Sequence, residues 1–396
     1  MRHRVGAFLR GETILIVATL LALISCFIVP PDWHYREYVH VSTIAQLICL
    51  MLVVCGLQRV GVFRIIGAKL LEHVDTARGL VLTFISLTFF SSMLITNDVA
   101  LLTFVPFALA VLKMAKMEDR AILVCTLMTI GANTGSMLTP IGNAHNLYFK
   151  ALTGMSTGHF LAVMGPYTAV SAAMLIAITC IVFRGRRLEG ISGMDSKSIE
   201  HGVLAPDSTK PQPDEIHVTG YGAGYGGRVI VYAITFIVCV LAVGDLIPLW
   251  VMCVVVFAVM MVCDRRSFRH ADWGLPLTFI MFFIFIGNMR RVPEFAQLAQ
   301  QCVGVHPLGV SILFSQVISN VPTSLLLAGF SNAYVPLIIG TNLGGLGTLI
   351  ASMASLVTYK HFTKMYPNQK GKYLKEYTSF CALFVLVLFG LSCILE

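Results

Sequence analysis

Two short polar motifs interrupt apolar sequence, and their residue types suit ligand binding. The first is Thr96-Asn97-Asp98, and the second is Ser319-Asn320. Amides and hydroxyls supply donors and acceptors without a net charge, so they can hold a small anion or a hard cation such as Na⁺. Asp98 adds a carboxylate, which in this position can ligate Na⁺, carry a proton or cap a helix.

Two longer stretches rich in glycine, asparagine and threonine also break apolar sequence. They read IGANTGSMLTPI at 130–141 and IGTNLGGLGTLI at 339–350, and six of the twelve aligned positions are identical. Backbone unwound within a membrane exposes carbonyls to a cation and helix N-termini to an anion. Close helix packing at small residues is the alternative, but a matched pair of stretches favours binding. The polar residues at and beside these breaks are Asn133, Thr139, Asn143, Asn342 and Thr348.

These motifs need elements that lie in a membrane. The 396 residues are 57% hydrophobic and only 12% charged, with a mean hydropathy of +0.81. Soluble domains carry roughly 25% charged residues, and recurring apolar runs of about 18 residues or more can span a bilayer. We therefore predict an all-α integral membrane protein with nine crossings. They lie at about 12–30, 41–58, 120–149, 160–183, 229–244, 249–263, 275–289, 335–359 and 376–395.

The cationic residues orient these crossings. Of the 28 Lys and Arg residues, 24 fall between crossings on one side, and the other four are Arg36, Lys150, Arg290 and Arg291. The positive-inside rule then places the N-terminus in the cytoplasm and the C-terminus outside, in a multi-pass protein of the cell inner (plasma) membrane. This arrangement holds only if 79–112 and 307–332 enter the membrane and turn back as re-entrant helical hairpins from opposite sides. The cytoplasmic loops account for the net charge of +8, which therefore does not indicate nucleic acid.

The matched motifs divide the chain into two halves of opposite orientation. Residues 1–183 form a first repeat, with the hairpin 79–112 and a broken transmembrane helix at 120–149. Residues 184–228 form a cytoplasmic linker. Residues 229–396 hold an extra span and the second repeat, with the hairpin 307–332 and a broken helix at 335–359. An inverted-topology repeat places the substrate near the midplane, so we expect Asn97 and Asn320 to face each other there.

Four stretches resemble the ion transporter superfamily. They are TNDVALL with the following PF (96–107), GANTGSMLTPIGN (131–143), SNVP (319–322) and NLGGLGTLIAS (342–352). Within that superfamily they are similar to the anion permease branch of divalent anion:sodium symporters, citrate-transporter-like permeases and arsenite permeases. The resemblance implies an elevator-type transporter. The tips here lack the third-position threonine of the Ser-Asn-Thr motif that the sodium symporters carry, and Asn-Asp at the first tip is closer to the arsenite permeases.

The resemblance also implies roles for individual residues. Asn97 and Asn320 would bind substrate, while Thr96, Ser319, Asn133 and Asn342 would lie at two cation sites. With Asp98 among the coupling residues, Na⁺ is predicted at Asn97, Asp98, Asn133, Asn320 and Asn342. Thr139, Asn143 and Thr348 complete the expected substrate site. His145 is an alternative proton carrier, and hydrogen bonding to its neighbours is the other reading of that residue.

The sequence thus predicts a secondary active transporter that moves a small anion, either a carboxylate or an inorganic oxyanion, coupled to Na⁺ or H⁺. Arsenite or metalloid efflux and Na⁺/H⁺ antiport are the alternatives. An enzyme is not expected, because one Asp and one His on separate segments do not make a catalytic set. No cofactor is expected apart from Na⁺ as coupling ion. The expected partners are a small anionic substrate and the lipid bilayer, and a homodimer is compatible with the sequence.

Overall fold

The computed structural model describes residues 13–71, 74–183 and 225–395, and within these ranges it contains helices and no strand. By length and composition, six of the described helices can each cross a membrane: α4 (Val41–Val60), α6 (Ala77–Ile95), α7 (Asn97–Met114), α10 (Thr157–Val182), α12 (Tyr225–Val243) and α21 (Lys370–Leu395). The pair α15 (Gly274–Arg290) and α16 (Pro293–Val305), bent by 106°, would make a seventh span. The chain is therefore an integral membrane protein of mostly apolar helices, and the ninefold crossing stays a prediction. The linker predicted at 184–228 lies outside the described residues up to position 224.

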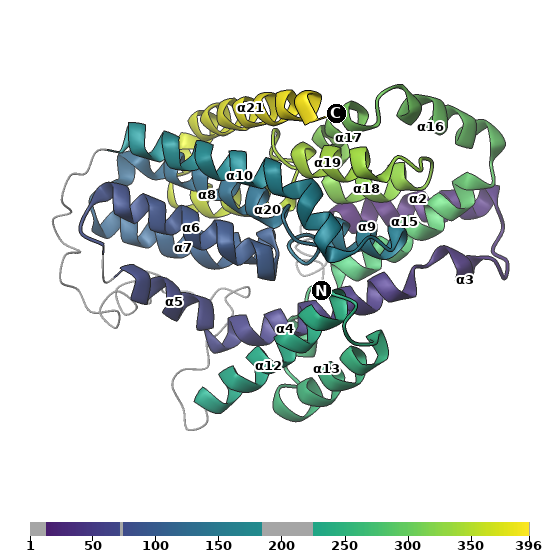
Figure 1. Cartoon of the computed structure of the whole chain (residues 1–396), viewed down its shortest axis with the longest axis horizontal. Helices are drawn as coiled ribbons and strands as arrows, with labels where there is room; N and C mark the ends of the chain where they lie inside the picture. Colours follow the sequence, from purple (N-terminus) through teal and green to yellow (C-terminus); the bar gives the residue numbers. More distant parts are fainter. Residues whose placement is uncertain (1–12, 72–73, 184–224, 396) are drawn as a thin grey trace.

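The first half of the chain carries nine of the described α-helices (Figure 1). They are α2 (Thr13–Ile28), α3 (Tyr35–Tyr38), α4 (Val41–Val60), α5 (Val62–Leu71), α6 (Ala77–Ile95), α7 (Asn97–Met114), α8 (Ala121–Ser136), α9 (Ala144–Thr153) and α10 (Thr157–Val182). Local signals set several ends. Thr76 caps α6 by accepting the Gly79 N–H, and Gly61 ends α4 in the left-handed conformation.

The second half begins at the first described residue after the linker. Its helices are α12 (Tyr225–Val243), α13 (Leu249–Cys263), α14 (Ser267–His270), α15 (Gly274–Arg290), α16 (Pro293–Val305), α17 (Pro307–Ile318), α18 (Asn320–Ala328), α19 (Tyr334–Gly344), α20 (Met353–Met365) and α21 (Lys370–Leu395).

Two helical hairpins occupy the segments predicted to turn back. The arms α6 and α7 pack on each other, as do α17 and α18. Each hairpin turns at one non-glycine residue with nearly the same strained backbone: Thr96 has φ 71° and ψ 151°, and Ser319 has φ 73° and ψ 154°. Such conformations cost about 1–3 kcal/mol. The arms of the first hairpin have 19 and 18 residues, enough to cross, whereas those of the second have 12 and 9, so re-entrance stays a prediction.

Two helices are broken at the glycine-rich stretches. The first stops at Ser136 and resumes at Ala144, and the second stops at Gly344 and resumes at Met353. Each first half packs along a hairpin arm, α8 on α6 and α19 on α17. Gly135 makes the closest approach, because a Cβ there would lie 2.1 Å from the carbonyl oxygen of Phe89. The break therefore begins where two backbones touch.

The second half of each broken helix packs against the other hairpin. Helix α9 contacts α18, and α20 contacts α7. In Figure 1 the first hairpin lies on the left and the second towards the right, with α8 beside the first and α19 and α9 beside the second. The two breaks are thus brought together in the middle of the molecule.

A second group of helices, α2, α4, α12, α13 and α15, lies beside these elements. Arg59 at the end of α4 binds Asp264 through two contacts of 2.5 and 2.7 Å, and Ser267 and Tyr232 donate to the same carboxylate. Burial raises the pKa of Asp264, but the hydrogen bonds and the Arg59 charge outweigh it, so the pKa lies below its usual value. This ion pair ties three helices together.

Candidate functional site

A hydrogen-bonded chain connects the first hairpin tip to both helix breaks. The Asn97 amide donates to Asn133 Oδ1 at 2.8 Å and to Ser352 Oγ at 3.4 Å, and Ser352 Oγ also donates to Asn133 Oδ1 at 3.1 Å. The Asn133 amide in turn donates to the Gly345 carbonyl at 3.4 Å and to Ser355 Oγ at 3.5 Å. The predicted residues Asn97 and Asn133 are therefore brought together with the second break.

Asn342 forms the matching connection from the other side. Its amide donates to Asn146 Oδ1 at 2.7 Å and to the Ile338 carbonyl at 2.9 Å. The Asn146 amide donates to the carbonyls of Ser136 and Thr139, each at 3.3 Å. Each break is thus cross-linked to the opposite half of the chain by a buried asparagine.

The second hairpin tip reaches the same break as the first. The Asn320 backbone N–H donates to the Ala351 carbonyl at 2.9 Å, and the Ser319 hydroxyl donates to that carbonyl at 3.3 Å. The Asn320 amide nitrogen lies beside Gly345, where a Cβ would be 2.9 Å away. Asn97 and Asn320 therefore meet neighbouring residues of one break, and no direct hydrogen bond joins them.

Thr139 and Thr348 fasten the hairpins to the breaks. The Thr139 hydroxyl donates to the carbonyl of Met93, and the Thr348 hydroxyl donates to the carbonyl of Gln316 at 3.0 Å. The Thr348 backbone N–H also donates to Gln316 Oε1 at 2.8 Å. Their hydroxyl hydrogens are used in these bonds, so in this structure neither threonine has a hydrogen to give an anion. In this structure each threonine joins a hairpin to a break, and a role in substrate binding stays a prediction.

Asp98 and Asn143 keep unused polar groups. Asp98 is half-buried in the first turn of α7, and its Oδ1 has no hydrogen-bond partner, while its N–H donates to Asn97 Oδ1 at 2.9 Å. Asn143 is buried at the start of α9 with no side-chain capping bond. Thr96 likewise makes no side-chain cap of α7. Asp98 therefore sits at the tip with at least one free acceptor.

His145 is fully buried on α9, beside Asn146. The Asn342 side chain interacts with its ring, although neither ring nitrogen lies within strict hydrogen-bond geometry of a partner. The hydrogen-bonded interpretation of this histidine therefore stays a prediction. Its role as a proton carrier stays a prediction.

We call the region around Asn97, Asn133, Asn320 and Asn342 the asparagine centre. Four helices begin at this centre, and their N-termini contribute to its electrostatics. They are α7, α9, α18 and α20, which start at or next to the two hairpin tips and the ends of the two breaks. Each helix N-terminus carries a partial positive charge of about half a unit. Among the described residues, no group of three His, Cys, Asp or Glu could hold a metal ion. Helix N-termini and amide N–H groups suit an anion, and the amide oxygens are ligands that suit Na⁺.

The centre is closed to solvent in this conformation. Asn97, Asn133, Asn320 and Asn342 are 2%, 5%, 3% and 4% exposed, respectively. A buried amide normally needs a partner, and the amides of Asn97, Asn133 and Asn342 each find at least one on another segment. A ligand could enter only if the hairpins or breaks move apart.

The sequence model of the citrate transporter family matches residues 7–333. This chain belongs to that family. It is similar to the inner membrane protein YbiR of Escherichia coli (strain K12), with 27% identity over 83% of this chain and 80% of that protein. It is also similar to the uncharacterized transporter MJ0456 of Methanocaldococcus jannaschii, with 27% identity over 87% of this chain and 86% of that protein. This family member is therefore a multi-pass membrane transport protein and not an enzyme.

Three residues of the asparagine centre are absent from the sequence prediction. They are Ser352, Asn146 and Ser355, which all hydrogen-bond to the predicted asparagines. The signal was present, because extending the alignment of the two breaks pairs Asn143 with Ser352 and Asn146 with Ser355. Polar residues at aligned positions just beyond a break are therefore candidate site residues as much as those within it.

Proposed function

We propose that this protein is a secondary active transporter for a small organic carboxylate anion, driven by the entry of Na⁺ or H⁺. One observation carries the proposal. The Asn97–Asn133–Ser352 chain of hydrogen bonds joins a hairpin tip to both helix breaks, at a point where four helix N-termini converge. The family's description as citrate transporters supports a carboxylate as the substrate class.

The inverted repeat is part of the same proposal, and three matched features support it. The tip residues Thr96 and Ser319 share one unusual backbone conformation. The bond from Thr139 to the end of α6 has its counterpart in the bond from Thr348 to the end of α17.

The third matched feature is the pair of cross-links between the halves. Aligning Asn133 with Asn342 also aligns Ser355 with Asn146, so the Asn133–Ser355 and Asn342–Asn146 bonds exchange under the repeat. Two such halves, pseudosymmetric across the centre, provide the two equivalent states that alternating access requires. We propose an elevator-type movement of the hairpins and broken helices past α4, α12, α13 and α15, in the inner membrane with the N-terminus in the cytoplasm.

Asp98 is the residue we propose for coupling. A carboxylate with a free oxygen beside the substrate asparagine can ligate Na⁺ together with amide oxygens, or bind a proton. Asp98→Asn separates the two. If the carboxylate carries a proton, the variant binds and exchanges substrate but no longer accumulates it under a pH gradient. If it ligates Na⁺, binding loses its sodium dependence.

The experiment is flux of radiolabelled citrate into proteoliposomes under imposed Na⁺ and pH gradients. Asn133→Ala removes the amide shared by both halves and is expected to reduce uptake by about tenfold or more. Asn288→Ala is the matched control, because Asn288 is equally buried and hydrogen-bonded, to Ser25 and Tyr35, but lies on α15 away from the centre. Loss of uptake in both variants alike would refute the site. Arsenite efflux or Na⁺/H⁺ exchange without citrate uptake would replace the proposed function.

A further inference from the structure

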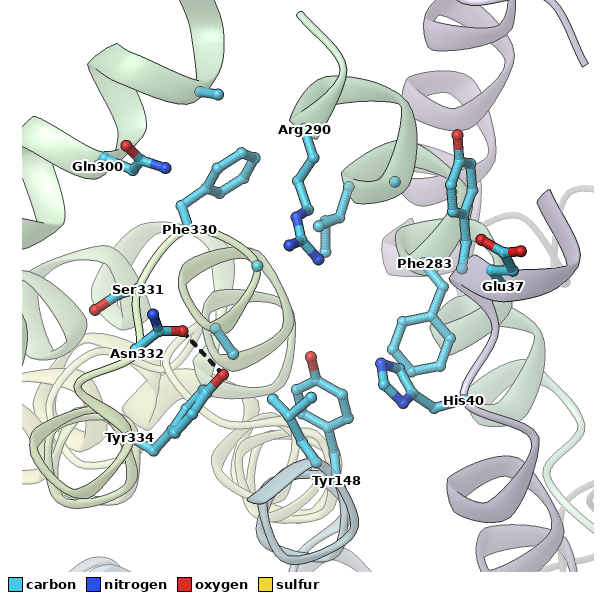
Figure 2. Close-up of a pocket in the computed structure, with 17 residues that line it drawn as sticks. Glu37, His40, Tyr148, Phe283, Arg290, Gln300, Phe330, Ser331, Asn332 and Tyr334 are labelled. Atoms are coloured by element: carbon cyan, nitrogen blue, oxygen red, sulfur yellow. Dashed lines mark hydrogen bonds between the residues drawn. The ribbon is translucent and has the colours of Figure 1, made fainter. Parts of the chain in front are cut away.

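A cavity of about 580 Å³ lies apart from the asparagine centre. Its walls come from the segment before α4, from α9, α15 and α16, and from the turn between α18 and α19 (Figure 2). None of the asparagines of the centre lines it. The cavity therefore needs an explanation of its own.

Arg290, at the last turn of α15, provides the positive charge of this cavity. Figure 2 shows its guanidinium extending between Phe330 and the Tyr148 hydroxyl. In the part of the chain that the structure describes, Arg290 has no ion-pair partner, although five other cation–anion pairs involving Lys or Arg are formed there. Glu37, the acidic residue of the lining, lies 3.6 Å from His34. An arginine without a carboxylate partner in a cavity is free to bind one from solution.

The neighbouring side chains add neutral donors. Burial lowers the pKa of His40, and the nearby Arg290 charge lowers it further, so the imidazole stays neutral near pH 7. Tyr148 is only 4% exposed and lies against the cavity. The Tyr334 hydroxyl donates to Asn332 Oδ1 at 3.3 Å (Figure 2), which orients that amide at the cavity wall.

Aromatic rings form the apolar part of the wall. Phe283 stands 5.2 Å from the His40 ring and 5.6 Å from the Tyr148 ring, measured between centroids. Flat apolar walls beside a guanidinium fork suit a ligand with a carbon skeleton and a planar carboxylate, more than a compact tetrahedral oxyanion.

We propose that this cavity is a second anion-binding site, in which Arg290 holds an organic carboxylate in two hydrogen bonds and Tyr148 donates a third. Helix α9 connects the two sites, because Tyr148 lies two residues beyond Asn146, the partner of Asn342. The inference deepens the proposed function and depends on it only for orientation. With the N-terminus in the cytoplasm, Arg290 lies on the outer side, and the cavity captures the anion before it reaches the centre.

The test is calorimetric titration of citrate into the purified full-length protein, with inorganic phosphate as the comparison anion. Asn133→Ala is used as the background in which the central site is disabled. In it, citrate is expected to bind one site, and adding Arg290→Gln is expected to weaken that binding by about tenfold or more. Arg36→Gln is the matched control, because this guanidinium lies 4.7 Å from the centre of the Trp33 ring and does not line the cavity.

The outcomes separate this proposal from the proposed function. Citrate binding to Asn133→Ala that ignores Arg290→Gln, or no binding to Asn133→Ala at all, overturns the second site even if transport depends on Asn133. Arg290-dependent binding alongside wild-type transport in Asn133→Ala overturns the central site and leaves the cavity. Phosphate binding as tight as citrate binding overturns the carboxylate class.

Discussion

Gly135→Ala should disrupt the contact on which the first helix break depends. The added Cβ would lie 2.1 Å from the Phe89 carbonyl oxygen and 2.7 Å from Ser92 Oγ, whereas ordinary contacts begin near 3.4 Å. The closest atom belongs to the backbone, so it cannot move aside alone. Helix α6 would have to withdraw from α8 by about 1 Å, and overpacking of this kind costs about 1–3 kcal/mol.

Gly131→Ala, four residues away on the same helix, is the control for the stability change at Gly135. At Gly131 the nearest atoms to an added Cβ are 3.4 and 3.5 Å distant, so Gly131→Ala fits and gains up to about 1 kcal/mol of helix propensity. At Gly135 the same gain offsets part of a clash of about 1–3 kcal/mol, leaving a net loss of up to about 2 kcal/mol. The withdrawal of α6 also strains the Thr139 bond to Met93, so we expect uptake to fall.

Thermal unfolding of the two variants in the same detergent measures this difference, and citrate flux per folded protein measures its effect on transport. We expect Gly131→Ala to match or exceed the wild-type Tm and Gly135→Ala to fall several degrees below it. Equal Tm values for the two variants would show that α6 and α8 do not touch at Gly135, and the geometry of the break would be refuted.

Four other substitutions, in three tests, probe the surroundings of the site. Asp264→Asn leaves Arg59 unpaired and should cost about 3 kcal/mol near pH 7. The pKa of Asp264 is lower in the folded state than the unfolded value of about 4. Its contribution to the stability of the protein is therefore complete above pH about 4 and is lost as the pH falls through the folded pKa. The Tm difference between Asp264→Asn and the wild type should shrink accordingly in acid. Asp245→Asn should lower the Tm more than Lys150→Met, because it leaves the buried Lys150 side chain, which is 6% exposed, charged and without its partner. The 66% exposure of the Asp245 side chain limits the loss of stability to about 1 kcal/mol. Thr96→Gly should raise the Tm, since glycine adopts φ 71° without strain worth about 1 kcal/mol or more, and a lowered Tm would contradict the strained tip.

Polar clusters within apolar sequence were enough to predict where several helices end. They predicted the turns at Thr96 and Ser319 and the interruptions after α8 and α19. These features are readable because glycine, asparagine and hydroxyl residues are costly within apolar helices unless the backbone needs them. The match to the citrate transporter family agrees with the sequence prediction of a transporter that is not an enzyme. The number of crossings depends on helix tilt and length, which composition does not determine.

The partners of the site residues could not be predicted in the same way. Thr139 and Thr348 were expected to bind substrate, but their hydroxyl hydrogens are used by carbonyls of the hairpins. Whether a hydroxyl faces a ligand or a carbonyl depends on the angle between packed helices, which neither residue type nor spacing specifies. The same holds for Asn97, which donates to Asn133 on α8 as well as to Ser352 in the second break. Asn320 meets that break through the Ala351 carbonyl.

Both hairpin tips rest on consecutive residues, Ala351 and Ser352, of a single helix break. One planar peptide unit joins the two contacts, so a shift of the break that changes the Asn97 contact also moves the carbonyl that holds Asn320. The two hairpins are therefore mechanically coupled through this peptide unit. A ligand that displaces it at one tip would alter the packing of the other tip at the same time.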